Sequence, residues 1–208
     1  ITHLYVDPTG NDTTGDGSSG TPYRSLTKIL SVAPENARIH VGAGSYTNGQ
    51  ETFPLVLNVD GVHLLGTNAT LTLVDAAGAT QRPLNVEDVT ACVISNLTFC
   101  NGSTLTAEHG GGINTYGSAV RMEDCVVRDN TTGSTGDGGG LYMHLGTLDL
   151  LRCQIRNNAT TGTAQGGGLY QYYGNLNMDS CEISGNALTG SSLGPYGGGI
   201  YLGSQGET

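Results

Sequence analysis

Apolar and polar residues alternate through most of residues 110–201, and the alternation repeats every 28 residues. Single polar residues separate the apolar ones, as in Leu148-Asp149-Leu150 and Cys153-Gln154-Ile155-Arg156. A period of two is typical of a β-strand and not of a helix. The pattern predicts about three short strands in each repeat: one after a glycine triplet, one over 147–150 and one over 153–156.

The glycine triplets mark the start of each repeat. They begin at Gly110, Gly138, Gly166 and Gly197, with three extra residues before the last. Self-similarity at a fixed period indicates units that stack and share one core. Because the triplets open strands, we interpret them as corners of the backbone rather than as a phosphate-binding loop, which would open a helix.

Aligning the repeats places apolar residues in common columns. The columns are Cys92, Val120, Leu148, Leu176; Ile94, Met122, Leu150, Met178; Leu97, Cys125, Cys153, Cys181; Phe99, Val127, Ile155, Ile183; and Ile113, Leu141, Leu169, Ile200. Strands of successive repeats must then lie parallel, about 4.8 Å apart, with like side chains above one another. The arrangement predicted is an all-β solenoid, a parallel β-helix.

A polar column supports this prediction. Asn130, Asn158 and Asn186 each follow the third strand, and Asn101 resembles an earlier member displaced by one residue. Asparagine tolerates left-handed backbone, and its amide can bond to the turns above and below. We therefore predict a stacked asparagine ladder at one corner of the coil.

The cysteines are expected to be thiols. Cys125, Cys153 and Cys181 should point inward as small apolar residues, because side chains stacked in parallel have the wrong orientation for a disulfide. Cys100 follows the inward Phe99 and is expected to point outward, as the one candidate for an external bond.

The start of the chain predicts a helix over 25–33. Ser25 is a plausible N-cap, apolar residues at 26, 29, 30 and 33 form one face, and Pro34 ends it. We expect this helix to lie over the first turn like a lid. One domain is predicted over 1–208, with a cap at 1–35, irregular turns at 36–109 and regular turns at 110–208.

The later part of the chain shows no such cap. The last complete turn is expected to expose Leu176, Met178, Cys181 and Ile183, which predicts either a longer coil or end-to-end self-association into filaments.

These motifs resemble a known class. Gly-Gly-Gly-Leu-Tyr followed by Cys-x-Ile-x-x-Asn resembles the repeats of polymorphic outer membrane proteins and related surface proteins, which are pectin-lyase-like β-helices. Leu4-Tyr5-Val6-Asp7-Pro8 and the segments at 21–26 and 39–46 resemble the N-terminal cap of secreted β-helix proteins. The resemblance implies a right-handed parallel β-helix with a short capping helix, secreted or on a cell surface. It implies no single activity, because the class includes lyases, hydrolases, epimerases, adhesins and fibre proteins.

Charge narrows the possible partners. The net charge is −10 and Lys28 is the only lysine, so nucleic acid and anionic membrane surfaces are poor partners. No apolar run has the length of a membrane span, and no cofactor is expected, with calcium as a possible exception. Asp7, Asp12 and Asp16 lie in one glycine-containing loop and could supply oxygen ligands to that ion. The alternative is a loop of Asx-turns.

Aromatic residues form the main outward feature. Tyr142, Tyr170 and Tyr201 share one column, and Tyr116, His144 and Tyr172 share the next. Rings suit sugar faces and protein interfaces, so we predict this strip to contact a glycan or a protein partner. The alternative is that stacked tyrosines stabilise the parallel strands. His109 has no obvious partner.

A catalytic set is harder to find. Opposite charges in adjacent repeats, Arg121 below Asp149 and Asp124 below Arg152, are explained by cross-strand pairing. Arg128 and Arg156 stack as like charges, which Asp129 relieves. No paired carboxylates occupy adjacent turns. The leading hypothesis is a non-catalytic extracellular surface, adhesive or fibre-forming module; the alternative is a polysaccharide lyase or a glycan-binding part of one.

Overall fold

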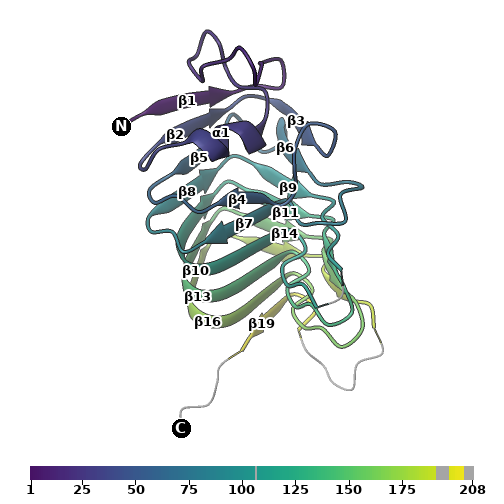
Figure 1. The fold of residues 1–208 in the computed structure, drawn as a ribbon. Coiled ribbons are helices and arrows are strands. Elements are labelled where there is room, and N and C mark those ends of the chain that lie inside the picture. Colours follow the sequence, from purple (N-terminus) through teal and green to yellow (C-terminus); the bar gives the residue numbers. More distant parts are fainter. Residues whose placement is uncertain (106, 191–196, 204–208) are drawn as a thin grey trace.

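The protein is a parallel β-solenoid in the computed structural model, which describes residues 1–105, 107–190 and 197–203 (Figure 1). Every strand pair within this part of the chain is parallel, and the turns stack along one axis. One sheet has ten strands, a second has six and a third has three. The six-stranded sheet receives one strand from each of about six turns, so the all-β solenoid predicted from the repeat is confirmed.

The early turns contain short strands. Their elements are β1 (His3–Val6), α1 (Leu26–Val32), β2 (Arg38–Val41), β3 (Gly44–Thr47), β4 (Leu55–Leu57), β5 (His63–Gly66), β6 (Thr72–Asp75), β7 (Leu84–Glu87), β8 (Cys92–Ser95) and β9 (Thr98–Cys100). The regular turns follow as β10 (Ile113–Glu123), β11 (Val126–Arg128), β12 (Thr131–Thr132), β13 (Leu141–Leu151), β14 (Gln154–Arg156), β15 (Ala159–Thr160), β16 (Leu169–Asp179), β17 (Glu182–Ser184), β18 (Ala187–Leu188) and β19 (Ile200–Leu202).

The strand boundaries within a repeat differ from the prediction. The first two predicted strands form one eleven-residue strand, and an additional two-residue strand follows each asparagine of the column. Gly117, Gly146 and Gly174 have positive φ angles, which lets each long strand bend without leaving its sheet. The alternation changes phase at the bend, from inward Ile113 and Thr115 to inward Ser118 and Val120. The sequence pattern therefore predicted two strands where the structure has one bent strand.

The pairing register confirms the apolar columns. Val120 pairs with Leu148 and Leu148 with Leu176, while Val127 pairs with Ile155 and Ile155 with Ile183. These side chains form a continuous core along the axis. In the last complete turn Leu176, Met178, Cys181 and Ile183 are only partly buried, as the sequence predicted.

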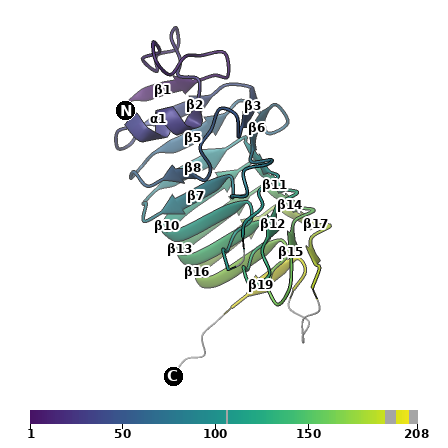
Figure 2. The same ribbon diagram turned by 45° about the vertical axis from the view of Figure 1, so that its right-hand side comes forward.

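The helix forms where expected but occupies a different place. The Ser25 hydroxyl accepts a hydrogen bond from the Lys28 backbone N–H, and Leu26 and Ile29 are buried. In chain order α1 precedes β2 just as β4 precedes β5, and it lies on the side of the coil that carries β4 and β7 (Figure 2). The expectation of a lid over the first turn is therefore wrong, because the helix replaces a strand in the wall of that turn.

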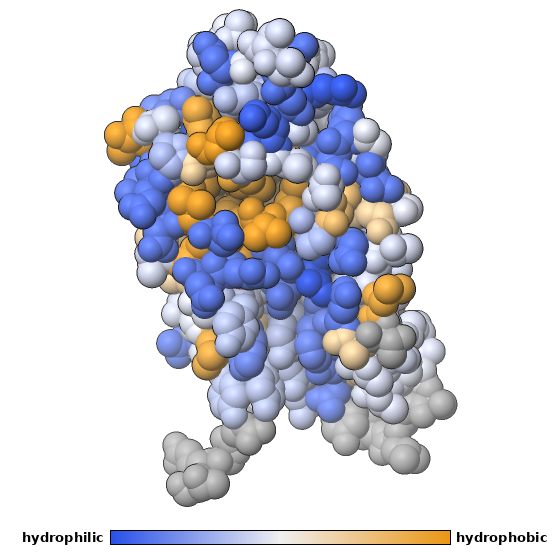
Figure 3. Space-filling view, viewed as in Figure 1, coloured by the Kyte–Doolittle hydropathy of each residue, from blue (hydrophilic) through white to orange (hydrophobic). Residues whose placement is uncertain are grey.

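The wall beside α1 is incompletely covered. Figure 3 shows apolar surface gathered at the level of α1 and β4, where Leu30, Leu55 and Val56 line a shallow depression. Below this level the same side of the molecule is formed by β7 and by the long strands β10, β13 and β16 (Figure 1).

Candidate functional site

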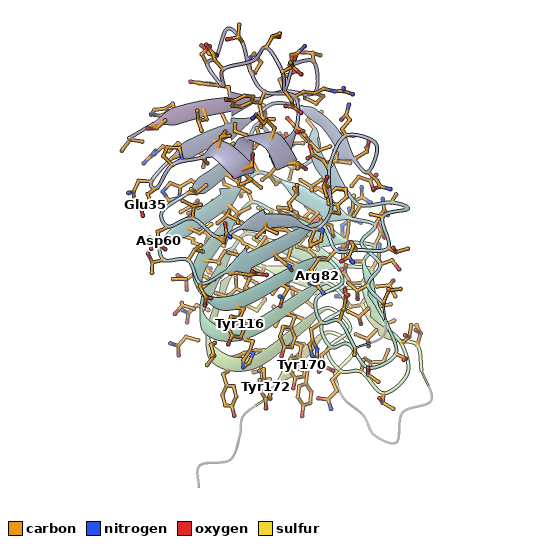
Figure 4. The ribbon with its side chains drawn as sticks, in the orientation of Figure 1. Glu35, Asp60, Arg82, Tyr116, Tyr170 and Tyr172 are labelled. Atoms are coloured by element: carbon orange, nitrogen blue, oxygen red, sulfur yellow. The ribbon has the colours of Figure 1, made fainter. Side chains whose placement is uncertain are left out.

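The surface formed by the first halves of β10, β13 and β16 carries most of the aromatic residues, and we call it the aromatic face. Asn114, Tyr142, Tyr170 and Tyr201 pair in register along one column. Figure 4 shows Tyr116, Tyr170 and Tyr172 on this face, below Arg82. Parallel pairing about 4.8 Å apart brings these rings together because the strand alternation points all of them outward.

One column forms a stack of parallel rings. The ring centroids of His109 and Tyr142 lie 4.4 Å apart, those of Tyr142 and Tyr170 lie 5.4 Å apart, and those of Tyr170 and Tyr201 lie 5.1 Å apart. Tyr142 is only 8% exposed and Tyr170 only 7%. Their ring faces contact each other, so these two residues support the face and leave little surface for a ligand.

The second column is more open. Tyr116 is 43% exposed and meets His144 edge-on with centroids 5.1 Å apart. His144 and Tyr172 also meet edge-on at 5.0 Å. The predicted register is wrong at this point, because His144 pairs with Tyr173 and Tyr172 lies in an irregularity of β16. Tyr172 and Tyr173 are thus presented side by side.

His109 has the partners that the sequence did not reveal. Its Nδ1 accepts a hydrogen bond from the Asp137 backbone N–H at 3.0 Å, and the Asp137 carboxylate accepts one from the Gln165 N–H at 2.8 Å. These three residues precede successive glycine triplets and are 28 residues apart, so their spacing was a signal that could have identified the column. An Asp137 oxygen lies 3.5 Å from the same Nδ1, but a nitrogen that accepts an N–H bond cannot also donate to a carboxylate. The imidazole is therefore neutral.

Arg82 lies at the edge of the aromatic face, on the side of the preceding turn. Its guanidinium donates to the Gly110 carbonyl at 3.0 Å, to Asn85 Oδ1 at 2.9 Å and to Glu108 Oε2 at 3.3 Å. The side chain is 8% exposed in total and contributes a fixed, buried charge. Sequence reasoning missed it because Arg82 lies before the regular repeats and its partners come from later segments.

The electrostatics of the aromatic face favour neutral groups. Burial lowers the pKa of His109 and raises the pKa of Asp137. Burial, assisted by Tyr170 and Asp137, raises the pKa of Tyr142, and burial raises the pKa of Tyr170 to about 12. A phenol with a raised pKa stays protonated at neutral pH, so it keeps its O–H as a donor and does not supply a phenolate base. This arrangement suits the binding of hydroxyl groups rather than proton abstraction.

The aspartates of the first loop do not converge on one point. Asp7 accepts from Thr9, Asp12 accepts from Arg24 and Ser25, and Asp16 accepts from the Ser18 backbone N–H. Each carboxylate therefore has its own partners: Asp7 and Asp16 lie in local turns, whereas Asp12 joins the loop to the residues just before α1. Within residues 1–105, 107–190 and 197–203, no group of three or more His, Cys, Asp or Glu side chains could hold a metal ion.

The asparagine column is held by side-chain amides. Asn130 donates from its N–H and its Nδ2 to Asn158 Oδ1, both at 3.0 Å, and Asn158 bonds to Asn186 Oδ1 in the same way at 2.9 and 3.0 Å. Asn130 and Asn158 are completely buried. Asn101 instead donates to Asp75, so it is not an earlier member of this column.

The cysteines of the regular turns repeat one contact. The thiols of Cys125, Cys153 and Cys181 each lie 3.4 Å from a backbone carbonyl of the preceding turn, and all are free thiols. Cys100 is outside the apolar core cluster yet fully buried, so its predicted exposure is wrong. Its strand neighbours in register are Asp75 and Arg128, and the Asn101 amide lies 3.7 Å from its sulfur.

The predicted charge pairs are only partly present. Arg152 forms two hydrogen bonds of 2.7 Å with the Asp124 carboxylate, as expected. Arg121 instead bonds Glu123, and Asp149 accepts from Asn177 at 2.7 Å. Glu123 and Arg121 lie on the same face of one strand, which makes them closer partners than the next turn offers.

Comparison with known proteins agrees with this architecture. Residues 8–202 match the family described as "Protein of unknown function (DUF1565)". The chain belongs to this family. No curated protein matches its sequence.

Two solved structures are similar to this DUF1565 protein to different degrees. A rhamnogalacturonan lyase has a TM-score of 0.58 at 15% identity; the match covers 100% of this chain and 63% of the lyase. A pectin methylesterase from carrot has a TM-score of 0.29 at 13% identity, covering 99% and 89%. The likeness to the lyase shows a shared fold, the parallel β-helix that the repeat predicted. Among the described residues, no helix is long and apolar enough to cross a membrane.

Proposed function

We propose that this DUF1565 protein is a non-catalytic extracellular module of the cell surface that binds a neutral glycan on its aromatic face. The observation that carries the proposal is the column of Tyr116, His144 and Tyr172, whose rings recur at 5.0–5.1 Å and meet edge-on. Edge contacts leave more ring surface uncovered than the stacked column does, as the 43% exposure of Tyr116 indicates. Uncovered rings that repeat with the turns offer successive platforms to an extended sugar chain.

The buried stack supports this role by fixing the platform. Tyr142 and Tyr170 are stacked between His109 and Tyr201. The stacking leaves these side chains few alternative conformations, so the surface beside the exposed rings is rigid. Rigid aromatic anchors lose little conformational entropy when a ligand binds. A surface or adhesive role follows from binding a polymer on a rigid and elongated coil.

The test compares a variant that removes the Tyr116 ring with a variant that keeps it. Tyr116→Ala is expected to weaken binding to a neutral glycan, first selected on an oligosaccharide array, by roughly fivefold to tenfold, because a ring contact is lost. Tyr116→Phe keeps the ring and is expected to retain most of the affinity. Tyr5→Ala, on β1 far from this face, is the matched control. Titration calorimetry provides the measurement, and equal effects of the 116 and 5 variants would exclude the aromatic face as the site.

A polysaccharide lyase is the second candidate, favoured by the structural likeness to the rhamnogalacturonan lyase. That likeness concerns the fold. The ultraviolet absorbance of unsaturated uronate products would detect lyase activity directly, and turnover of any uronate polymer would replace our proposal. End-to-end association stays a prediction, which light scattering over a range of concentrations would check.

A further inference from the structure

A groove on the outer side of the six-stranded sheet concentrates positive charge. It is lined by residues of the neighbouring strands β9, β11 and β14 (Figure 1), namely Thr98, Val126, Arg128, Gln154 and Arg156, and by Arg152, which lies between β13 and β14. These are three of the chain's seven arginines. Asp124 is the one carboxylate in the lining, so the groove carries a net charge of +2 (three arginines less one aspartate) in a protein whose net charge is −10.

The arginines stand on both sides of the groove. Arg128 and Arg156 pair in register and are about 4.8 Å apart along the axis. Arg152 precedes Arg156 by four residues and lies at the corner between β13 and β14, where its φ angle is positive. Thr98, Val126 and Gln154 pair in register between them and form a mixed polar and apolar floor.

One of these arginines has no internal partner. Arg128 is paired with Asp129, and Arg152 is paired with Asp124. The residue that corresponds to Asp129 one turn later is Asn157, so Arg156 lacks an equivalent carboxylate. Among the described residues, no hydrogen bond or ion pair engages the Arg156 guanidinium. Like charges in register on adjacent parallel strands are unfavourable, and an anionic ligand between them would remove that cost.

The ends of the groove limit the ligand. Asp75 lies two strands before Arg128 in the same outward column, and Glu182 pairs with Gln154 on the following turn. The positive stretch therefore spans only two or three turns and is bounded by carboxylates. A long polyanion would extend past the arginines into those carboxylates, so the groove fits only a short run of anionic groups. Sugar rings in addition offer apolar faces to Val126.

We propose that this groove binds a linear anionic glycan, with a carboxylate or sulfate held by the guanidinium groups of Arg156 and Arg128. Guanidinium binds such groups through two parallel N–H bonds, which gives both affinity and orientation. The groove and the aromatic face lie on different sheets, so this binding does not depend on the function proposed above.

The experiment uses the full chain with polygalacturonate as the uronate probe and its methyl ester as the matched uncharged ligand. Arg156→Gln is expected to weaken binding of polygalacturonate about tenfold, the effect of losing one charge-assisted contact. Arg38→Gln, an exposed arginine on β2, changes the net charge equally and is expected to alter affinity less than twofold. Circular dichroism and thermal melting would confirm that both variants fold, and Arg156→Lys should restore part of the affinity.

Competing ligands distinguish specific binding in this groove from a general attraction between opposite charges. Equal weakening by Arg156→Gln and Arg38→Gln, or equal affinity for the methyl ester, would overturn the proposal. Stronger binding of single-stranded RNA than of polygalacturonate or chondroitin sulfate would overturn it as well. Affinity for chondroitin sulfate above that for polygalacturonate would identify sulfate as the preferred group. Tyr116→Ala should leave polygalacturonate binding unchanged, so failure of the aromatic site and failure of the groove are distinguishable.

Discussion

The early turns and the regular turns complete the same solenoid by different means. In the regular turns one contact is repeated: Asn130, Asn158 and Asn186 use the same amide bonds, turn after turn. In the early turns each polar contact is used once. Buried Glu51 accepts from the Leu26 and Thr27 backbone N–H groups at 2.8 and 2.7 Å, and Asp12 binds Ser25.

This difference teaches how a coil can begin. A regular turn is stabilised by an identical neighbour on each side, whereas the first turn has such a neighbour on one side only. The helix α1 fills the missing wall, and its free N–H groups must then be satisfied by side chains from other segments. Glu51 accepts from the first two N–H groups of the helix, the Ser25 hydroxyl accepts from the Lys28 N–H, and Asp12 holds Ser25 in place.

The largest effect is expected in the asparagine column. Asn158→Ala should destabilise the protein by about 3 kcal/mol, because it leaves the Asn130 N–H and the Val127 carbonyl buried without that partner. Asn101→Ala, outside the column, should cost much less. Urea unfolding followed by circular dichroism would measure both. Equal costs would show that the repeated amides are no more important than a single surface contact.

A smaller effect is expected at the helix of the first turn. Glu51→Ala should cost about 2 kcal/mol, since Leu26 and Thr27 lose their acceptor and the helix loses a cap. Glu35→Ala, an exposed glutamate just after the helix, is the matched control. Urea unfolding again gives the free energy. Hydrogen exchange should show that the loss of protection is confined to α1 and its neighbours. A loss of protection spread evenly over the regular turns would contradict the difference between early and regular turns.

The smallest effect concerns acid stability. Burial alone would raise the pKa of Asp12, but hydrogen bonds from Ser25 and Arg24 lower it overall. Because the pKa of Asp12 is lower in the folded than in the unfolded protein, the ionised carboxylate stabilises the fold at pH values above the unfolded-state pKa, which is near 4. This stabilisation is lost as the pH falls through the folded-state pKa. Asp12→Asn should therefore lower stability at neutral pH and flatten the decline below about pH 5. Unfolding free energies measured across this range would check it; an unchanged acid slope would contradict it.

Much of the architecture was predictable because a solenoid repeats its neighbours. Residues 28 apart in the sequence lie one turn apart in space, so the apolar columns could be assigned by counting. The positions of the exposed Tyr116 and the half-buried His144 on the aromatic face followed from the same rule. The spacing of 28 residues also relates His109 to its partner Asp137, but this relation was not recognised from the sequence.

Other features depended on contacts between turns that do not repeat. Tyr142 becomes buried because His109 and Tyr170 stack on either side of it. Cys100 is buried although its strand alternation points it outward. The unpaired charge of Arg156 arises where Asn157 takes the place of an aspartate.

The sequence by itself determined the parallel coil, its register and its inward columns, because periodicity specifies which residues are stacked. The tertiary structure alone decided where α1 lies, which outward rings stay exposed and which arginines meet in one groove. Those outcomes depend on contacts between segments from different turns, and the spacing of the repeats does not specify these contacts.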